Sequence, residues 1–143
     1  AAEKGAHIIC FQELFTTHWF PREMDKRYFS LAERLDGLTI KTMQKLAKEY
    51  GVVLICPIFE IEKDSFYNSA IVIDADGEVL GSYRKIHVPQ IPLWEERYYF
   101  SSGNHGFPVF KTQFAPIGVQ ICWDNFFPEG SRILALKGAK ILF

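Results

Sequence analysis

Apolar residues recur at helical spacing in two parts of the chain. In the first, six apolar positions alternate with three lysines: Leu35, Leu38, Met43, Leu46, Ala47 and Tyr50 against Lys41, Lys45 and Lys48. This period predicts a helix over 35–50, and Gly51 is expected to end it. A second helix is predicted over 128–137, opened by a proline and followed by Gly138.

Short, nearly continuous apolar runs predict buried strands. They cover residues 8–11, 52–59, 67–74, 79–83 and 117–122, and a further strand begins at 141. The Asp76-Gly77 turn between the third and fourth runs predicts an antiparallel hairpin. Strands that alternate with helices indicate parallel crossings as well, so the sequence predicts an α/β fold with a mixed sheet. Residues 87–108 hold three prolines and are expected to form a long, functional loop.

Composition and charge narrow the class of protein. The 143 residues are 48% hydrophobic and 23% charged, which predicts a single folded domain over 1–143. A net charge of -1 indicates no nucleic acid or anionic membrane partner, and no apolar run approaches the ~20 residues that span a bilayer. Three scattered cysteines predict neither a disulfide framework nor a metal site, and they favour a reducing, cytoplasmic location. The four isolated histidines match no metal-binding spacing.

Three polar residues follow predicted strands: Glu13, Lys85 and Cys122. Reactive groups of α/β proteins gather at the carboxyl ends of strands, and a carboxylate, an ammonium and a thiol together suffice for acyl transfer. A helix directly after Cys122 would lower the pKa of its thiol. Taken singly, each residue also has a structural interpretation: an inert core cysteine, a salt-bridging carboxylate and an edge-strand lysine.

Three segments carry a resemblance to a known family. They are Phe11-Gln12-Glu13, the run from Tyr83 to Pro89, and the run from Gly118 to Asp124. In this order and spacing they resemble the carbon–nitrogen hydrolase (nitrilase) superfamily along essentially the whole chain. The resemblance implies an α-β-β-α sandwich. It also implies an incomplete copy of that fold, because the first strand and the C-terminal third of the family pattern are not found; the abrupt ends suggest a fragment.

The resemblance also implies a catalytic triad of Glu13, Lys85 and Cys122, with Glu96 as a second glutamate near the site. Glu13 would act as general base for the thiol, while Lys85 and the backbone N–H of Trp123 would hold the oxyanion. Hydrolysis would proceed through a thioester with release of ammonia. This chemistry implies no metal and no cofactor.

The expected substrate is a small linear amide, most closely an N-carbamoyl amine. The segment from Cys122 to Glu129 is similar to that of N-carbamoylputrescine amidohydrolases. The expected substrate pocket consists of Trp19, Trp94, Asp124 and Phe126. Residues 90–94 (Gln-Ile-Pro-Leu-Trp) depart from the family pattern, which leaves an aliphatic or arylalkyl amide, or a nitrile, as the alternative. Trp94 is equally compatible with packing in a homodimer or larger homo-oligomer.

Two interpretations of another class stay open. The chain could be a catalytically incomplete domain that retains the family sequence, with exposed sheet edges and apolar faces. It could also be a redox-sensing thiol protein, in which Cys122 forms a sulfenic acid without amide turnover.

Overall fold

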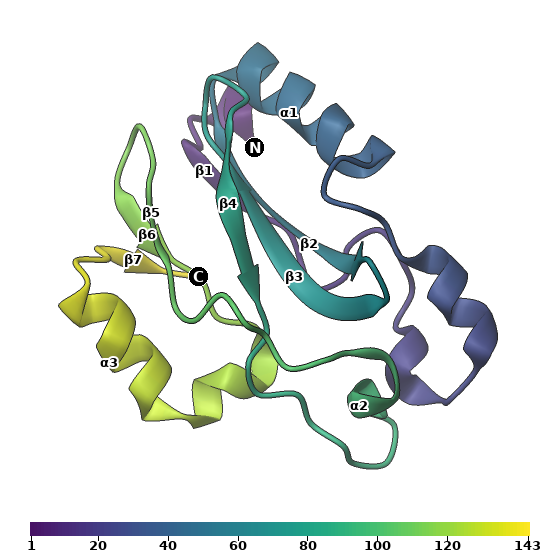
Figure 1. Ribbon diagram of the computed structural model, residues 1–143. Helices are drawn as coiled ribbons and strands as arrows, with labels where there is room; N and C mark the ends of the chain where they lie inside the picture. The colour runs from purple at the N-terminus through teal and green to yellow at the C-terminus, as the bar shows by residue number, and fades with distance from the viewer.

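Two β-sheets lie face to face between two α-helices in the computed structural model, which describes residues 1–143 (Figure 1). The first sheet has the order β1-β2-β3-β4, formed by Ile8–Cys10, Val53–Glu62, Ser65–Ile73 and Val79–Arg84. The second has the order β5-β6-β7, formed by Val109–Lys111, Pro116–Gly118 and Ile141–Leu142. Strands β1 and β2 are parallel, as are β6 and β7, and the other pairs are antiparallel. Both sheets are therefore mixed.

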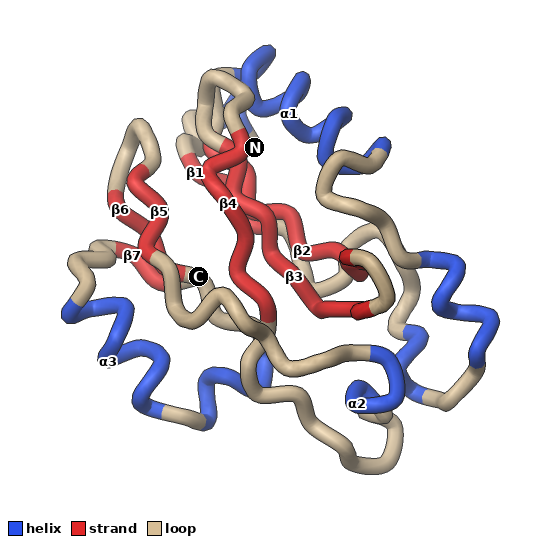
Figure 2. The backbone as a smooth tube through the Cα atoms, viewed as in Figure 1, coloured by secondary structure: helices blue, strands red, loops and turns tan.

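The helices differ in length and position (Figure 2). The two longer ones, α1 (Leu38–Tyr50) and α3 (Pro128–Leu136), cover the outer faces of the sandwich, whereas α2 (Glu96–Tyr99) interrupts the long loop. Four 3₁₀ helices complete the set: η1 (Ala2–Lys4), η2 (Phe20–Arg22), η3 (Lys26–Leu31) and η4 (Cys122–Phe126). Gly51 ends α1 with a φ of 60°, as its position predicts. None of the helices is long and apolar enough to cross a membrane.

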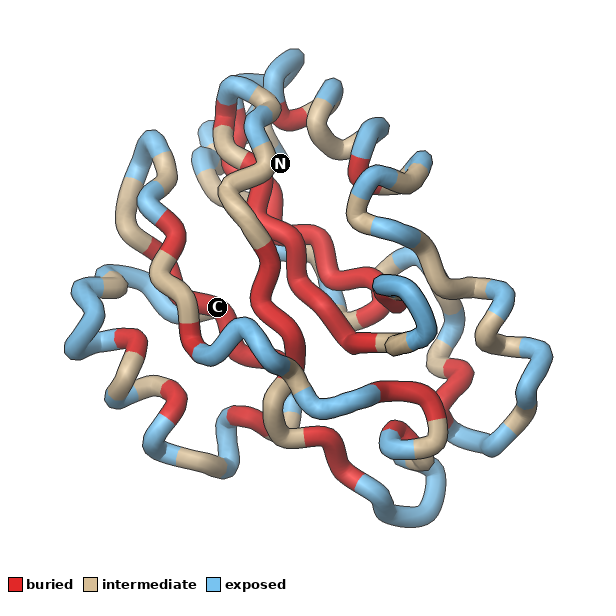
Figure 3. The backbone as a smooth tube through the Cα atoms, viewed as in Figure 1, coloured by how far each residue is buried: buried red, intermediate tan, exposed pale blue.

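Strand β2 shows how the layers are held. Its side chains alternate between the two faces of the sheet. Leu54 and Cys56 pack with Ile40 of α1, while Val53 and Ile55 face a core shared with the second sheet. Figure 3 shows the central strands as the most buried part of the chain. The order of layers is α1, first sheet, second sheet, α3, which confirms the predicted α-β-β-α sandwich.

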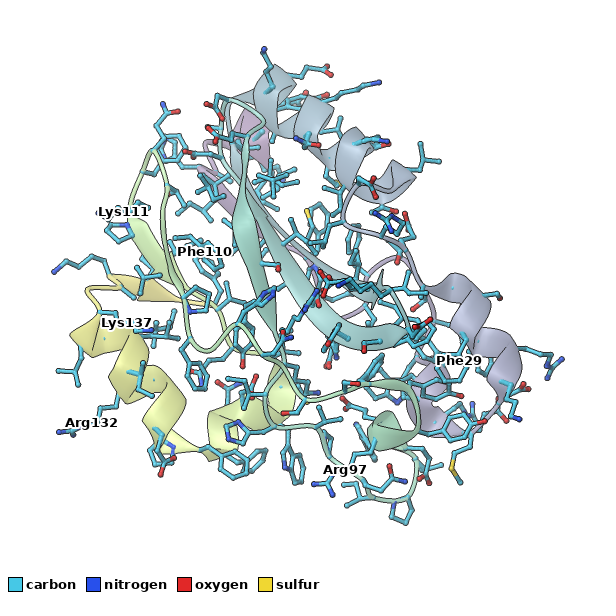
Figure 4. All side chains as sticks on the ribbon, in the orientation of Figure 1. Phe29, Arg97, Phe110, Lys111, Arg132 and Lys137 are labelled. Atoms are coloured by element: carbon cyan, nitrogen blue, oxygen red, sulfur yellow. The ribbon has the colours of Figure 1, made fainter.

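Close approach between layers depends on two glycines. Gly81 in β4 has a φ of +143°, and a Cβ there would lie 3.2 Å from a ring carbon of Phe110 on β5. Figure 4 labels the Phe110 side chain. A Cβ at Gly118 in β6 would lie 2.9 Å from the side chain of Leu134 on α3. A side chain at Gly81 would be strained and would press on the Phe110 ring, and one at Gly118 would displace the Leu134 side chain.

Several boundaries differ from the sequence prediction; the helix predicted over 35–50, for example, begins at Leu38. Strands β2 and β3 form a longer hairpin than expected, closed by the pair Glu62 and Ser65. The turn between them has no glycine, and Lys63 itself adopts a φ of 54°. The strand predicted over 117–122 ends at Gly118, because β7 offers only two paired residues.

Candidate active site

The ends of three strands bring four ionisable side chains together. Glu13 lies in the turn that follows β1, Lys85 comes directly after β4, and Cys122 opens η4 after β6. Glu96 joins them as the first residue of α2. Segments far apart in the chain therefore converge at one end of the sandwich.

Lys85 lies between two carboxylates. Its Nζ is 2.9 Å from Oε1 of Glu13 and 2.7 Å from Oε2 of Glu96, and its side chain is 0% exposed. Burial acts to lower the pKa of Lys85, but the two neighbouring carboxylates outweigh it and the pKa is raised. The amine is therefore a fixed positive charge.

Glu96 is the most deeply buried acid of the group. Its side chain is fully buried, and burial raises its pKa to about 7 although Lys85 acts in the opposite direction. Its Oε1 atom has no hydrogen-bond partner. Near neutral pH Glu96 therefore exchanges a proton readily, which suits a group that assists acid–base chemistry.

Cys122 and Glu13 line the same cavity, which has a volume of about 120 Å³. Burial and the negative charge of Glu13 raise the pKa of the Cys122 thiol, while Lys85 and the Trp123 backbone N–H lower it. The prediction of a lowered thiol pKa is therefore wrong. The segment after Cys122 is a five-residue 3₁₀ helix, and α3 begins only at Pro128, so no aligned α-helical dipole begins at the sulfur. The backbone of Cys122 has a φ of 47°, a left-handed conformation that is costly for a non-glycine residue.

Asn68 on β3 is a member of this group that the sequence analysis missed. Its Nδ2 donates to Oε1 of Glu13 at 2.7 Å, and its backbone oxygen accepts from the Lys85 N–H at 2.8 Å. The sequence signal that could have identified Asn68 is its position in the strand. Ala70 and Val72, which lie on the same face of β3, belong to the apolar core between the sheets. A polar side chain on an otherwise apolar face indicates a specific partner.

Asp124 occupies a different place from the expected substrate pocket. Its carboxylate is 0% exposed, accepts three hydrogen bonds and contacts the His87 ring. Oδ2 accepts from the Tyr83 hydroxyl at 2.6 Å and from the Ile121 N–H at 3.0 Å. Oδ1 accepts from the backbone N–H of His87 at 3.0 Å and lies 2.8 Å from its Nδ1. Asp124 thus connects the segments around Lys85 and Cys122.

The aromatic residues expected around the substrate lie elsewhere. Trp19 and Trp94 line a separate cavity of about 420 Å³, where Nε1 of Trp19 donates to the Leu93 carbonyl at 3.2 Å. Phe126 is 74% exposed, with its ring 5.0 Å from that of Trp123. Trp123 lines a third cavity, of about 560 Å³. None of these side chains lines the cavity of Glu13 and Cys122.

The sandwich and its cluster of cysteine, lysine and two glutamates define a class of protein. The chain belongs to the carbon–nitrogen hydrolase family, whose model matches residues 1–143.

Individual relatives agree with this assignment. The chain is 49% identical to an N-carbamoylputrescine amidase of Solanum lycopersicum over 100% of its own length and 48% of the relative. It is 46% identical to a citrullinase of Francisella tularensis over 99% of the chain and 50% of that protein. Among solved structures, a carbon–nitrogen hydrolase from Helicobacter pylori matches with a TM-score of 0.90 and 37% identity, over 95% of this chain and 46% of that one. The chain thus spans about half the length of the relatives it matches.

Proposed function

We propose that the protein containing this chain hydrolyses the carbon–nitrogen bond of a linear amide through a cysteine thioester. The observation that carries the proposal is the position of Lys85, whose Nζ bridges Glu96 and Glu13, the carboxylate that lines the cavity of Cys122. A buried ammonium held beside a nucleophile is suited to stabilise the oxygen that becomes negative in acyl transfer.

In the first half of the reaction Glu13 accepts the thiol proton of Cys122, and the sulfur attacks the substrate carbonyl carbon. The carbonyl oxygen becomes an oxyanion, held by the Lys85 ammonium and the Trp123 backbone N–H. The oxyanion then collapses and the carbon–nitrogen bond breaks. Protonated Glu13 returns its proton to the leaving nitrogen, which departs as ammonia and leaves a thioester on Cys122.

In the second half a water molecule attacks the thioester carbon. Glu13 takes one proton from the water, and Glu96 assists as a second proton-exchanging group. Collapse of the second oxyanion expels the Cys122 sulfur, which recovers a proton from Glu13. An N-carbamoyl amine would yield a carbamic acid, which decomposes to carbon dioxide and the free amine.

An N-carbamoyl amine is the proposed substrate class. The relatives include proteins named N-carbamoylputrescine amidase and citrullinase, and both names denote substrates with a terminal carbamoyl group.

A homo-oligomer is proposed as the assembly of the protein. It is supported by exposed apolar side chains at Leu93, Trp94 and Phe126.

Ammonia release by the full natural chain tests the proposal. The panel is N-carbamoylputrescine, citrulline, an aliphatic amide and a nitrile, and turnover is expected with the carbamoyl compounds. Cys122→Ala should abolish it, and trapped parent enzyme should show a covalent acyl mass on Cys122. Cys10→Ala is the matched control, because Cys10 lines the same cavity without a role in the mechanism. No ammonia from any of these compounds would favour a catalytically incomplete domain, and reversible sulfenic acid on Cys122 without turnover would favour redox sensing.

A further inference from the structure

We infer that Asn68 is a positioning residue that fixes which oxygen of Glu13 acts as the base; this inference rests on the proposed function. Two donors converge on one carboxylate oxygen: Nδ2 of Asn68 at 2.7 Å and Nζ of Lys85 at 2.9 Å both contact Oε1 of Glu13. The other oxygen, Oε2, has no hydrogen-bond partner in the protein.

The two oxygens of the Glu13 carboxylate therefore have different roles. Oε1 accepts two hydrogen bonds and is held in place. Oε2 keeps its lone pairs, and the Glu13 side chain is 21% exposed beside the cavity that it shares with Cys122. Since only an oxygen with a free lone pair takes up a proton without first losing a hydrogen bond, Oε2 is the atom that receives the thiol proton.

Lys85 alone would hold the carboxylate less precisely. Its ammonium has three rotatable donors on a flexible stem, and another of them is directed to Glu96. Asn68 is different, because its amide is planar and is carried by the interior of β3. The backbone oxygen of Asn68 also accepts from the Lys85 N–H at 2.8 Å. Asn68 therefore holds the Glu13 carboxylate through its side chain and the backbone of Lys85 through its carbonyl oxygen.

The oxygen of the Asn68 side-chain amide argues against a purely structural role for this residue. Asn68 is 1% exposed, and its Oδ1 is buried without a hydrogen-bond partner. A buried acceptor without a donor costs stability. A residue selected for stability alone at this position, next to Ala70 and Val72 on an apolar face, would be aliphatic.

Two substitutions of similar size test the inference in the full natural chain, with N-carbamoylputrescine as substrate. Asn68→Leu removes the donor together with the unpartnered oxygen. Asn68→Asp keeps the shape but sets a carboxylate oxygen against Glu13. Both are expected to lower kcat roughly 10- to 100-fold with little change in KM, the rate equivalent of one hydrogen bond to a charged group. For Asn68→Leu the melting temperature should stay near that of the parent.

Ser69→Ala is the matched control, because Ser69 is also buried on β3 but its hydroxyl donates to Glu60 in a separate ion pair. It should leave kcat unchanged. A kcat within twofold of the parent for folded Asn68→Leu would overturn the inference, as would a kcat that falls only in proportion to lost stability.

A crystal structure of Asn68→Leu supplies a readout that needs no substrate. The Glu13 carboxylate is expected to rotate or to occupy more than one position. An unmoved, single carboxylate would contradict the positioning role. A parent protein that releases no ammonia from any compound of the panel would instead contradict the proposed function, and the crystallographic result would still decide the role of Asn68.

Discussion

The Tyr83 hydroxyl donates a hydrogen bond to Oδ2 of Asp124 at 2.6 Å, and so joins strand β4, which leads into Lys85, to the 3₁₀ helix η4 that begins at Cys122. Both partners are fully buried. Burial and the Asp124 carboxylate raise the pKa of Tyr83, so the phenol stays a donor. The same carboxylate accepts from the Ile121 N–H directly before Cys122. A buried contact thus supports the strained backbone of Cys122, the proposed nucleophile.

Tyr83→Phe is therefore expected to lower the free energy of unfolding by about 1.5–3 kcal/mol, the value of a hydrogen bond to a charged group. Chemical denaturation of the full chain measures it. Tyr67→Phe is the control, since the Tyr67 hydroxyl makes no hydrogen bond and its ring instead lies 3.9 Å from the Arg84 guanidinium. Equal losses for the two variants would show that the Asp124 contact adds nothing.

Lys85→Met should leave a folded protein with turnover reduced roughly 100- to 1000-fold, because one oxyanion donor and its charge are removed. The measurement is the rate of ammonia release at saturating substrate. Lys111→Met, at an exposed position on β5, should behave as the parent. Near-normal turnover of Lys85→Met would exclude the oxyanion role.

The Glu96 carboxyl group predicts a dependence of stability on pH. Its pKa in the folded chain is about 7, above the ordinary value near 4.5. Between these values the folded state retains a proton that the unfolded state has released, so the contribution of Glu96 to stability is fully present below about pH 4.5 and is lost as pH rises toward 7. The change amounts to roughly 3 kcal/mol.

Unfolding of Glu96→Gln, compared with the parent at pH 5 and pH 8, measures this contribution. The glutamine variant should lose the part of the slope that comes from Glu96. Glu95→Gln, at the adjacent and partly exposed position, should keep the slope of the parent. Identical slopes for parent and Glu96→Gln would refute the raised pKa.

Glu13→Gln should separate the acidity of the thiol from catalysis. The charge of Glu13 raises the pKa of Cys122, so its removal is expected to lower that pKa, as measured by thiolate absorbance. Ammonia release should nevertheless be lost, because glutamine cannot accept the thiol proton. A variant that gained thiolate and retained turnover would show that Glu13 is not the base.

Much of the fold is predictable because local patterns and tertiary packing agree. The helix that ends at Gly51 and the hairpin around Asp76-Gly77 follow from helical period and turn chemistry. The turn at Lys63 was missed because a lysine in a left-handed conformation leaves no compositional signal.

The site was predictable only where a motif was present. Glu13, Lys85 and Cys122 each follow a predicted strand, so their convergence could be expected from topology. Asn68 interrupts an apolar strand face, which indicates a polar partner. The identity of that partner could not be predicted, because it depends on the cross-strand register that the long hairpin sets. The direction of the Asp124 side chain could not be predicted either. A carboxylate two residues after the proposed nucleophile has the same sequence position whether it faces a ligand or the core.

The charged pair Glu13 and Lys85 belongs to one sheet, whereas Cys122 extends from the other. Neither layer on its own contains every group of the proposed reaction. A folding intermediate in which β1–β4 are formed but the two sheets are not yet packed together would show no amide turnover. The time at which turnover appears during refolding would therefore report when the two layers dock.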